Sequence, residues 1–213
     1  RKDQSIVQAR RERAAAFAAM RERLQDGGGQ VRVIVRLNTD FTPEADLPAM
    51  AARKRIALER AGSLGSGLRV EDVDALRAGG PSSLESIAGG LDPERGLVIV
   101  TEGLTSYLST GALVGLWERC ATILASFSSG RYLADVMPRS AGSNPLVRGG
   151  RIALSAFVRG KVHFHFADER EVEEALRQSG FAEASVRPAH EIVAAGGTPA
   201  SLGMARIADA RTG

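Results

Sequence analysis

The sequence is poor in the residues that mark secreted, metal-clustering and nucleic-acid-stacking proteins. It contains a single cysteine, Cys120, so it can form neither an internal disulfide bond nor a cluster of thiolate metal ligands. Aromatic residues make up only 5% of the chain, which leaves little surface on which nucleic-acid bases could stack. We therefore expect a protein of the reducing cytoplasm that does not bind nucleic acid.

The chain also lacks long apolar runs and a strong excess of either charge. No stretch is apolar over the roughly 20 residues that a membrane-spanning helix needs, and the segment RKDQSIVQARRERAAAF has neither the apolar region nor the cleavage site of a secretory signal. The 28 basic and 25 acidic residues give a net charge of +3, and Arg and Glu alternate along the first predicted helix. A membrane is therefore not an expected partner.

Strand and helix patterns alternate along the 213 residues, which suffice for one domain. Strand patterns occur at 31–37 (VRVIVRL), 96–101 (GLVIVT) and 132–137, and a helix pattern runs from Leu113 to Phe127. Parallel strands covered on both faces are continuously apolar, so we expect Leu97–Val100 and Tyr132–Val136 to be neighbours near the sheet centre. The alternation predicts an α/β fold with a doubly wound, mainly parallel sheet and helices on both faces.

The remaining segments carry local signals of helix ends and strands. Capping boxes at Ser82/Glu85 and Asp168/Glu171 predict two helix starts. Extended segments are predicted at 161–166 (KVHFHF) and 181–187, with Gly180 ending the helix between them. We assign one domain over 1–213, with an N-terminal helix within 1–29 and a weakly structured tail over 196–213. The sequence leaves the oligomeric state open.

Acidic residues follow several of the predicted strands. In an open parallel sheet, ligands bind beyond the carboxyl ends of the strands, so these residues are candidates for a binding site. They are Glu44, Asp46, Asp74 and Glu102. Carboxylates there can accept hydrogen bonds from ribose hydroxyls, an adenine amine or the ammonium of an amino-acid-like ligand. The alternative is that each one only caps a helix.

Five segments together resemble the leucine carboxyl methyltransferase-like enzymes, which include bacterial O-methyltransferases linked to polyketide pathways. They are EADLPAMAARKRIALERAG (44–62), DALRAGG (74–80), DPERGLVIVTEGLTSYLS (92–109), GRYLADVMP (130–138) and LRQSGFAEASV (176–186). The resemblance covers roughly 44–187 and implies transfer of a methyl group from S-adenosylmethionine to an oxygen, often a carboxylate or hydroxyl, of a small molecule. It also implies a mainly parallel sheet with an antiparallel C-terminal hairpin.

The resemblance also implies roles for individual residues. Asp46 would hold the ribose of the donor, Asp74 would meet the adenine, and Glu102 would lie near the methionine part, with Glu44 grouped among these cofactor-binding residues. Tyr107 would line the methyl-transfer pocket as its catalytic residue. The alternative for Tyr107 is an aromatic ring packed under the following helix.

Two histidines, His163 and His165, share one face of the predicted strand KVHFHF because side chains alternate with a period of two. We interpret them as a polar sheet face. The alternative is that one of them accepts the proton of an alcohol substrate. Without a third ligand nearby in the sequence, they are poor candidates for a metal site.

The chain departs from the family pattern after its first predicted strand. Family members follow that strand with a glycine-containing loop and a helix that cradle the donor, whereas here NTDFTP leads directly to EADLP. We therefore expect weak binding of S-adenosylmethionine or none. Two functions remain open, an O-methyltransferase and a non-catalytic methyltransferase-like binding module. A nicotinamide-dependent oxidoreductase is disfavoured because no G-x-G-x-x-G follows a predicted strand.

Overall fold

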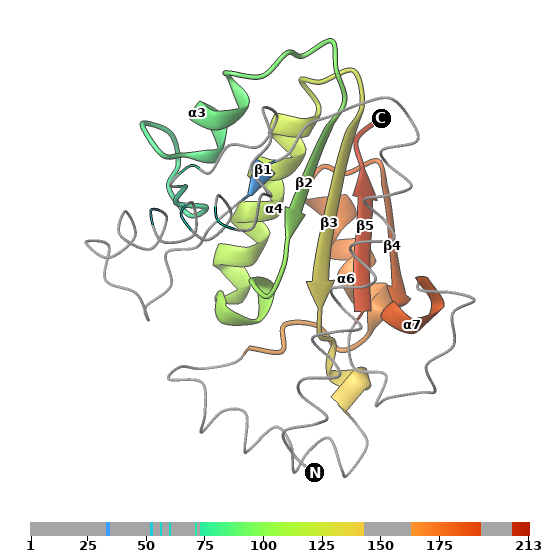
Figure 1. Ribbon diagram of the computed structural model, residues 1–213. Helices are drawn as coiled ribbons and strands as arrows, with labels where there is room; N and C mark the ends of the chain where they lie inside the picture. The colour runs from blue at the N-terminus through green and yellow to red at the C-terminus, as the bar shows by residue number, and fades with distance from the viewer. Residues whose placement is uncertain are drawn as a thin grey trace.

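The computed structural model describes residues 33–34, 52, 56, 60, 71, 73–142, 163–192 and 206–213. These residues form a five-stranded sheet in the order β1-β2-β3-β5-β4 (Figure 1). The strands are β1 (Val33–Ile34), β2 (Leu97–Thr101), β3 (Gly130–Val136), β4 (Glu183–Pro188) and β5 (Arg206–Arg211). Strands β1, β2 and β3 are parallel, whereas β5 runs antiparallel to both β3 and β4. The expected α/β sheet with an antiparallel C-terminal part is thus confirmed.

The two apolar strands are neighbours, as predicted. Strand β2 pairs in parallel with β3 from Leu97↔Gly130 to Thr101↔Ala134. Leu97 and Ile99 are buried on one face, and the half-buried Val98 and Val100 pack against a second cluster on the other. Apolar side chains on both faces explain why the run GLVIVT does not alternate with polar residues.

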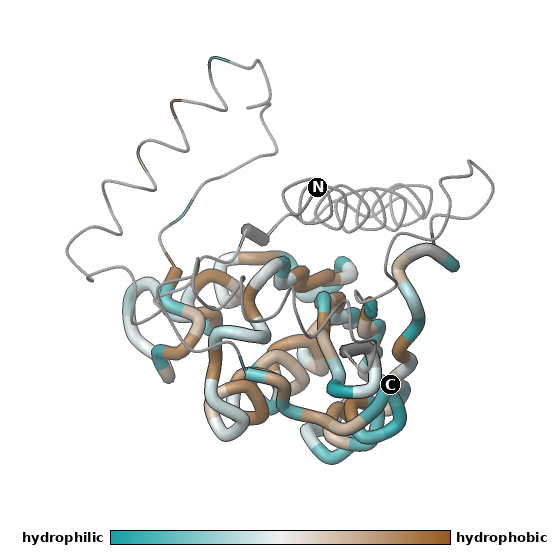
Figure 2. The backbone as a smooth tube through the Cα atoms, turned by 90° about the horizontal axis from the view of Figure 1, so that it is seen from below, coloured by the Kyte–Doolittle hydropathy of each residue, from teal (hydrophilic) through white to brown (hydrophobic). Residues whose placement is uncertain are grey.

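Helices cover the two faces of the sheet unequally (Figure 1). They are α3 (Leu84–Ala88), α4 (Thr110–Leu124), α6 (Glu169–Gln178) and α7 (Ala189–Ile192). Side chains of α3, α4 and α6 share one core with the sheet, while α7 packs with Leu133 and Ile207 on the opposite face. Figure 2 shows hydrophobic segments (brown) alternating with hydrophilic ones (teal) along the described part of the chain. The fully doubly wound arrangement stays a prediction, since the long helices among the described elements lie on one face.

Helix α4 follows the predicted apolar spacing. It starts after Ser109, whose hydroxyl accepts the backbone N–H of Ala112 at 3.2 Å. Its buried side chains include the predicted series Leu113, Leu116, Trp117, Cys120 and Leu124. Burial raises the pKa of the Cys120 thiol to about 12, so this thiol behaves as a small buried hydrophobe.

Of the two predicted capping boxes, one has the predicted cap residue, although its Glu171 accepts the N–H of Ala167 rather than that of Asp168, and the other cap is one residue off. Asp168 caps α6 by accepting the N–H of Glu171 at 2.9 Å, and Gly180 ends this helix with φ +105°. Helix α3, however, is capped by Ser83, which accepts the N–H of Ser86 at 3.1 Å. The prediction of Ser82 as the cap is wrong because its backbone is left-handed (φ 64°), and Glu85 binds another partner instead.

Two further sequence predictions are wrong. The tail predicted as weakly structured contains β5, an inner strand between β3 and β4. Residues 163–166 are not a strand, because β5 occupies the sheet position beside β3 and their polar groups pair with loops. The helix predicted within 1–29 and residues 196–205 lie outside the described residues, so the single-domain assignment stays a prediction. Among the described helices, none has the length and apolar character to cross a bilayer.

Candidate functional site

The loops that follow β2 and β3 meet at one edge of the sheet, because these strands are parallel. Figure 2 views the molecule from this edge, toward which the β2 and β3 arrows of Figure 1 point. The β2 loop comprises residues 102–109, including a 3₁₀ turn at Thr105–Tyr107 (η2). The β3 loop leads into a second 3₁₀ turn, Arg139–Gly142 (η3). Ligand-binding side chains of this fold class are expected on these loops.

Asp135, near the end of β3, holds the β2 loop in place. Its carboxylate Oδ1 accepts the backbone N–H of Gly103 at 2.6 Å, and its backbone carbonyl accepts the hydroxyl of Thr105 at 2.7 Å. Gly103 has φ +70°, a left-handed conformation that glycine adopts without a steric penalty. The loop therefore turns sharply away from β2 and presents Glu102 to solvent.

A third segment, 163–167, joins the two loops. The N–H of His163 donates to the carbonyl oxygen of Ser106 at 2.8 Å. Arg139 donates its backbone N–H to the carbonyl of Phe166 at 2.9 Å and its Nε–H to that of Phe164 at 3.2 Å. The segment thus binds the β2 loop at one end and η3 at the other, which explains why it is extended without belonging to the sheet.

Both ring nitrogens of His165 have hydrogen-bond partners. Nε2 lies 3.0 Å from the carbonyl oxygen of Thr105, which can only accept, so this nitrogen carries the proton. Nδ1 lies 3.0 Å from Thr110 Oγ1, whose hydroxyl then donates to it. Burial lowers the pKa of His165, with further lowering by His163 and Arg139, against the Thr105 hydrogen bond that raises it. His165 is therefore a neutral side chain that ties α4 to the β2 loop.

The ring of His163 stacks on that of His165. Their centroids are 5.7 Å apart and the planes differ by 10°. The predicted shared face of the two histidines is thus observed, although its neighbours are loops rather than a sheet.

Three buried side chains next to the site are joined by hydrogen bonds. Trp117 donates its Nε1–H to the hydroxyl oxygen of Tyr132 at 3.1 Å, and this hydroxyl lies 2.7 Å from Thr101 Oγ1. Desolvation strongly raises the pKa of Tyr132, so the phenol stays protonated. These contacts link α4 to the last residue of β2 and fix the point from which the β2 loop starts.

The structure places the predicted site residues in two locations. Glu102 is exposed and Tyr107 half-buried, and both belong to the loop after β2. Asp74 starts a separate turn, where its Oδ1 accepts the N–H of Leu76 at 2.9 Å. This contact closes a turn and does not cap a helix, because the next helix, α3, begins at Leu84 with Ser83 as its cap. Glu44 and Asp46 lie outside the described residues.

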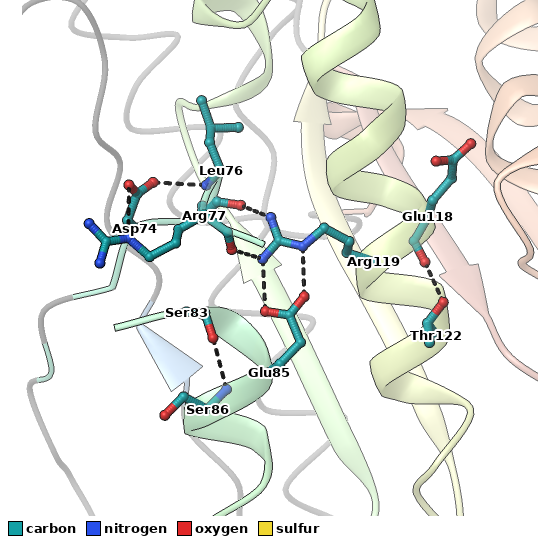
Figure 3. Close-up of polar contacts among 10 residues, drawn as sticks. Asp74, Leu76, Arg77, Ser83, Glu85, Ser86, Glu118, Arg119 and Thr122 are labelled. Atoms are coloured by element: carbon teal, nitrogen blue, oxygen red, sulfur yellow. Dashed lines mark hydrogen bonds and ion pairs between the residues drawn. The ribbon is translucent and has the colours of Figure 1, made fainter. Parts of the chain in front are cut away.

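Arg119 attaches the turn of Asp74 to α4 (Figure 3). Its Nη1 and Nη2 donate to the carbonyl oxygens of Ala75 at 2.8 Å and Arg77 at 2.5 Å. Its Nε and Nη2 also form a bidentate pair with Glu85, at 2.7 and 2.9 Å. The hydrogen bond from Arg119 lowers the pKa of Glu85 to about 2. One guanidinium thus joins the 74–77 turn, α3 and α4.

Sequence reasoning missed Asp135 and Arg139. Both belong to the edge formed by the carboxyl ends of the parallel strands. Asp135 was missed because only residues directly after the predicted strands were considered, and Asp135 is still inside β3. The rule would have found it if the last two positions of each strand had been included. Within the described ranges, no three His, Cys, Asp or Glu side chains gather as metal ligands.

The comparisons with known proteins found similarity to solved structures. No family model and no curated protein matches the sequence. Among solved structures, the S-adenosylmethionine-dependent methyltransferase SibL in its apo form matches with TM-score 0.50 and 15% identity, over 78% of this chain and 41% of SibL. A provisionally assigned O-methyltransferase from Nostoc punctiforme PCC 73102 matches with TM-score 0.46 and 11% identity, over 79% of this chain and 42% of that one.

A protein from Bordetella parapertussis, described as a possible exported protein, matches with TM-score 0.46 and 15% identity, over 83% of this chain and 52% of that one. The chain therefore spans about half the length, or less, of these three structures. At 15% identity, the similarity to SibL is one of fold alone. The chain has a methyltransferase-like α/β fold.

Proposed function

We propose that the chain transfers a methyl group from S-adenosylmethionine to an oxygen of a small molecule. The observation that carries this proposal is the loop after β2, which Asp135 holds so that Glu102 and Tyr107 lie at the carboxyl edge of the parallel strands. The fold similarity to SibL and the resemblance of the segment DPERGLVIVTEGLTSYLS to methyltransferases support it.

The described residues fit the charged part of the donor. Its ammonium and sulfonium groups are cationic, and Glu102 offers an exposed carboxylate at the edge where ligands of this fold class bind. Arg139, exposed at the start of η3, offers a guanidinium for the donor carboxylate. Asp46 and Asp74 remain proposals for the ribose and adenine, with Glu44 in the same cofactor-binding set. The donor, when bound, supplies an electrophilic methyl carbon on a positively charged sulfur.

The protein has to align the donor with its acceptor and exclude water. The buried chain of Trp117, Tyr132 and Thr101 fixes the end of β2, and Asp135 fixes the loop that continues from it. Tyr107 follows in η2 and is half-buried, and we assign it to the acceptor side of the proposed site. Positioning by these residues, with no covalent intermediate on the protein, is sufficient for an in-line methyl transfer.

A second candidate function is a binding module that keeps the fold without catalysis. The observation in its favour is the absence of a glycine-containing loop between VRVIVRL and EADLP. Each charge-assisted hydrogen bond missing there would weaken donor binding by about 1.5–3 kcal/mol, so losing two could move a micromolar site toward millimolar. We therefore expect the affinity for the donor to be low.

Calorimetric titration with S-adenosylhomocysteine tests the proposal, with NAD as the comparison ligand. We expect a dissociation constant between about 10 μM and 1 mM, no heat with NAD, and weaker binding by Glu102→Gln. Glu94→Gln, an exposed residue of the turn before β2, is the matched control and should bind like the wild type. The absence of binding at millimolar ligand would contradict the enzyme and favour the binding module.

A further inference from the structure

We propose that two side chains of α6, Glu173 and Arg177, close the outer edge of β4, and that this edge pairs with β4 of a second copy of the chain once they are removed. The inference concerns an interaction surface and is independent of the proposed methyl transfer. It rests on backbone groups of β4 whose hydrogen bonds end on side chains instead of on another strand.

Strand β4 is the last strand of the described sheet and has β5 on one side (Figure 1). A strand at the end of a sheet presents N–H and C=O groups that can pair with another chain. Folded proteins block such groups with charged side chains, with proline or with a covering helix. The outer edge of β4 is therefore the place at which the described sheet can accept a further strand.

Glu173 and Arg177 are four residues apart in α6, so they lie on the same side of the helix. The Glu173 carboxylate accepts the backbone N–H of Val186 at 2.9 Å, and Nη2 of Arg177 donates to the backbone carbonyl of Ala184 at 2.9 Å. The two side chains also form an ion pair with an N–O distance of 3.4 Å. We call Glu173 and Arg177 the edge pair, because together they bind one donor and one acceptor of β4.

The two hydrogen bonds of the edge pair show which backbone groups of β4 point away from β5. Backbone groups of alternate residues in a strand point to the same side, so those of Ala184, Val186 and Pro188 face the outer edge. Proline has no backbone N–H, and Pro188 therefore offers no donor to a further strand. The edge is thus closed by an ion pair along its middle and by a proline at its end.

The residues of β4 are complementary to themselves in antiparallel pairing. When Ala184 is opposite Val186 of the second copy, a two-fold axis passes through the pair of Ser185 residues. Each Ala184–Val186 pair then exchanges both of its N–H···O=C hydrogen bonds. One bond of each pair runs from the Val186 N–H to the Ala184 carbonyl, and the edge pair occupies both of these groups. Removal of the edge pair therefore frees the groups that the second copy needs.

The exposed side chains of β4 favour the same register. Glu183, Ser185 and Arg187 are exposed, whereas Ala184 and Val186 are buried on the other face of the strand. In the two-fold register, Glu183 of each copy is opposite Arg187 of the other. Opposite charges directly across two strands stabilise their pairing. This charge complementarity identifies a second copy of the chain, rather than an arbitrary extended peptide, as the partner.

Sedimentation velocity of the full chain over a series of concentrations tests the inference. We expect Glu173→Ala/Arg177→Ala to dimerise roughly tenfold or more tightly than the wild type, because two blocked hydrogen-bonding groups per copy become available. Arg177→Ala alone is a milder variant and should give a smaller increase. The matched control is Arg170→Ala/Glu174→Ala, which removes one charge of each sign from α6 at the same spacing and should sediment like the wild type.

An exchange of charges tests the register of the dimer. In the Glu173→Ala/Arg177→Ala background, Arg187→Glu places a second carboxylate opposite Glu183, so dimerisation should fall back to the wild-type level. Adding Glu183→Arg restores opposite charges across the two strands and should restore the dimer. Association through another surface would not respond to this exchange.

Thermal unfolding checks that each variant is folded. A folded Glu173→Ala/Arg177→Ala that sediments like the wild type at every concentration would overturn the inference, and so would association that persists after Arg187→Glu. Equally tight association of the wild type would show that the edge pair does not close β4. If the double variant unfolds, Arg177→Ala with and without Arg187→Glu decides the same two points.

Discussion

Asp135 and Gly103, 32 residues apart in the chain, are joined by a hydrogen bond of 2.6 Å from the Gly103 N–H to the Asp135 carboxylate. The same aspartate is 9% exposed and also accepts the Thr105 hydroxyl through its backbone carbonyl. A charged acceptor in a largely buried position binds a backbone donor more strongly than an exposed one. The conformation of the candidate site loop therefore depends on a side chain from the neighbouring strand.

Removal of the Asp135 carboxylate should destabilise both the protein and its site. We expect Asp135→Ala to lower the free energy of unfolding by about 1–3 kcal/mol, because the Gly103 N–H loses a partly buried acceptor. Asp135→Asn keeps an acceptor oxygen and should lose less. Urea unfolding measures both, with Glu94→Ala as an exposed control that should change stability by less than about 0.5 kcal/mol. Equal stability of Asp135→Ala and the wild type would refute this role.

Two glycines around α4 should respond to alanine in opposite directions. At Gly130, a Cβ atom would lie 2.6 Å from the carbonyl oxygen of Leu124 and 2.7 Å from its Cβ, so Gly130→Ala should destabilise by about 1–3 kcal/mol. At Gly115, inside α4, a Cβ atom meets no atom of the described residues within 4 Å apart from its chain neighbours and the backbone of its own helix. Gly115→Ala should therefore stabilise by up to about 1 kcal/mol. Thermal unfolding of the two variants should move the melting temperature in opposite directions.

The parts of the fold that were predicted from the sequence have local or strongly apolar signals. Strand β2 is continuously apolar, and α4 has both a serine cap and a regular apolar face. Strand β5 (RIADAR) gave no such signal, because Ala208 and Ala210 are its core residues on the helix face and are too small to mark it. Its Asp209 pairs with Arg131 of β3, 78 residues away. Such a partner cannot be recognised from one sequence.

The candidate site was predicted only where its residues lie close together in the chain. Glu102 and Tyr107 belong to one motif, TEGLTSYLS, so their shared loop followed from the sequence. Asp135 and Arg139 reach this loop through tertiary contacts, and the period-two pattern of KVHFHF was typical of a strand although its hydrogen bonds go to loops. Periodicity reports which way side chains point, whereas the partner of a backbone depends on which segment occupies the neighbouring position.

The Arg119–Glu85 pair should make stability depend on acid. The folded-state pKa of Glu85 is about 2, below its ordinary value of 4.5. The contribution of Glu85 to the free energy of unfolding is therefore present above pH 4.5 and is lost as the pH falls toward 2. Because 39% of the Glu85 side chain is exposed, we expect a contribution of about 1 kcal/mol. Glu85→Gln should lose this amount at pH 7 and little at pH 2.5. A pH-independent difference in urea unfolding would contradict the pair.

His165 should add a second pH dependence near neutrality. The folded-state pKa of His165 lies below the ordinary value of 6.5, so the unfolded chain binds the proton more strongly. The contribution of His165 to the free energy of unfolding is therefore complete above pH 6.5 and is lost as the pH falls below that value. Urea unfolding between pH 7.5 and pH 5 should show the decline. His165→Gln should remove that part of the slope and destabilise by about 1–2 kcal/mol at pH 7.5, because two hydrogen bonds change. If the free energy of unfolding changed with pH in the same way for the variant and the wild type, His165 would not be a buried neutral histidine.

The insertion of β5 between β3 and β4 has a consequence for the order of folding on the ribosome. Among the described strands, β3 and β4 are joined only through β5, and the pair Arg131↔Arg211 closes a long stretch of chain. Until β5 has left the exit tunnel, both β3 and β4 have an unpaired edge facing the gap that it will fill. The nascent chain can assemble β1, β2, β3 and α4 early, whereas β4 with α6 must wait for the strand made after it. The described sheet is therefore joined in its middle by the described strand that comes last in chain order, rather than by growth at an edge.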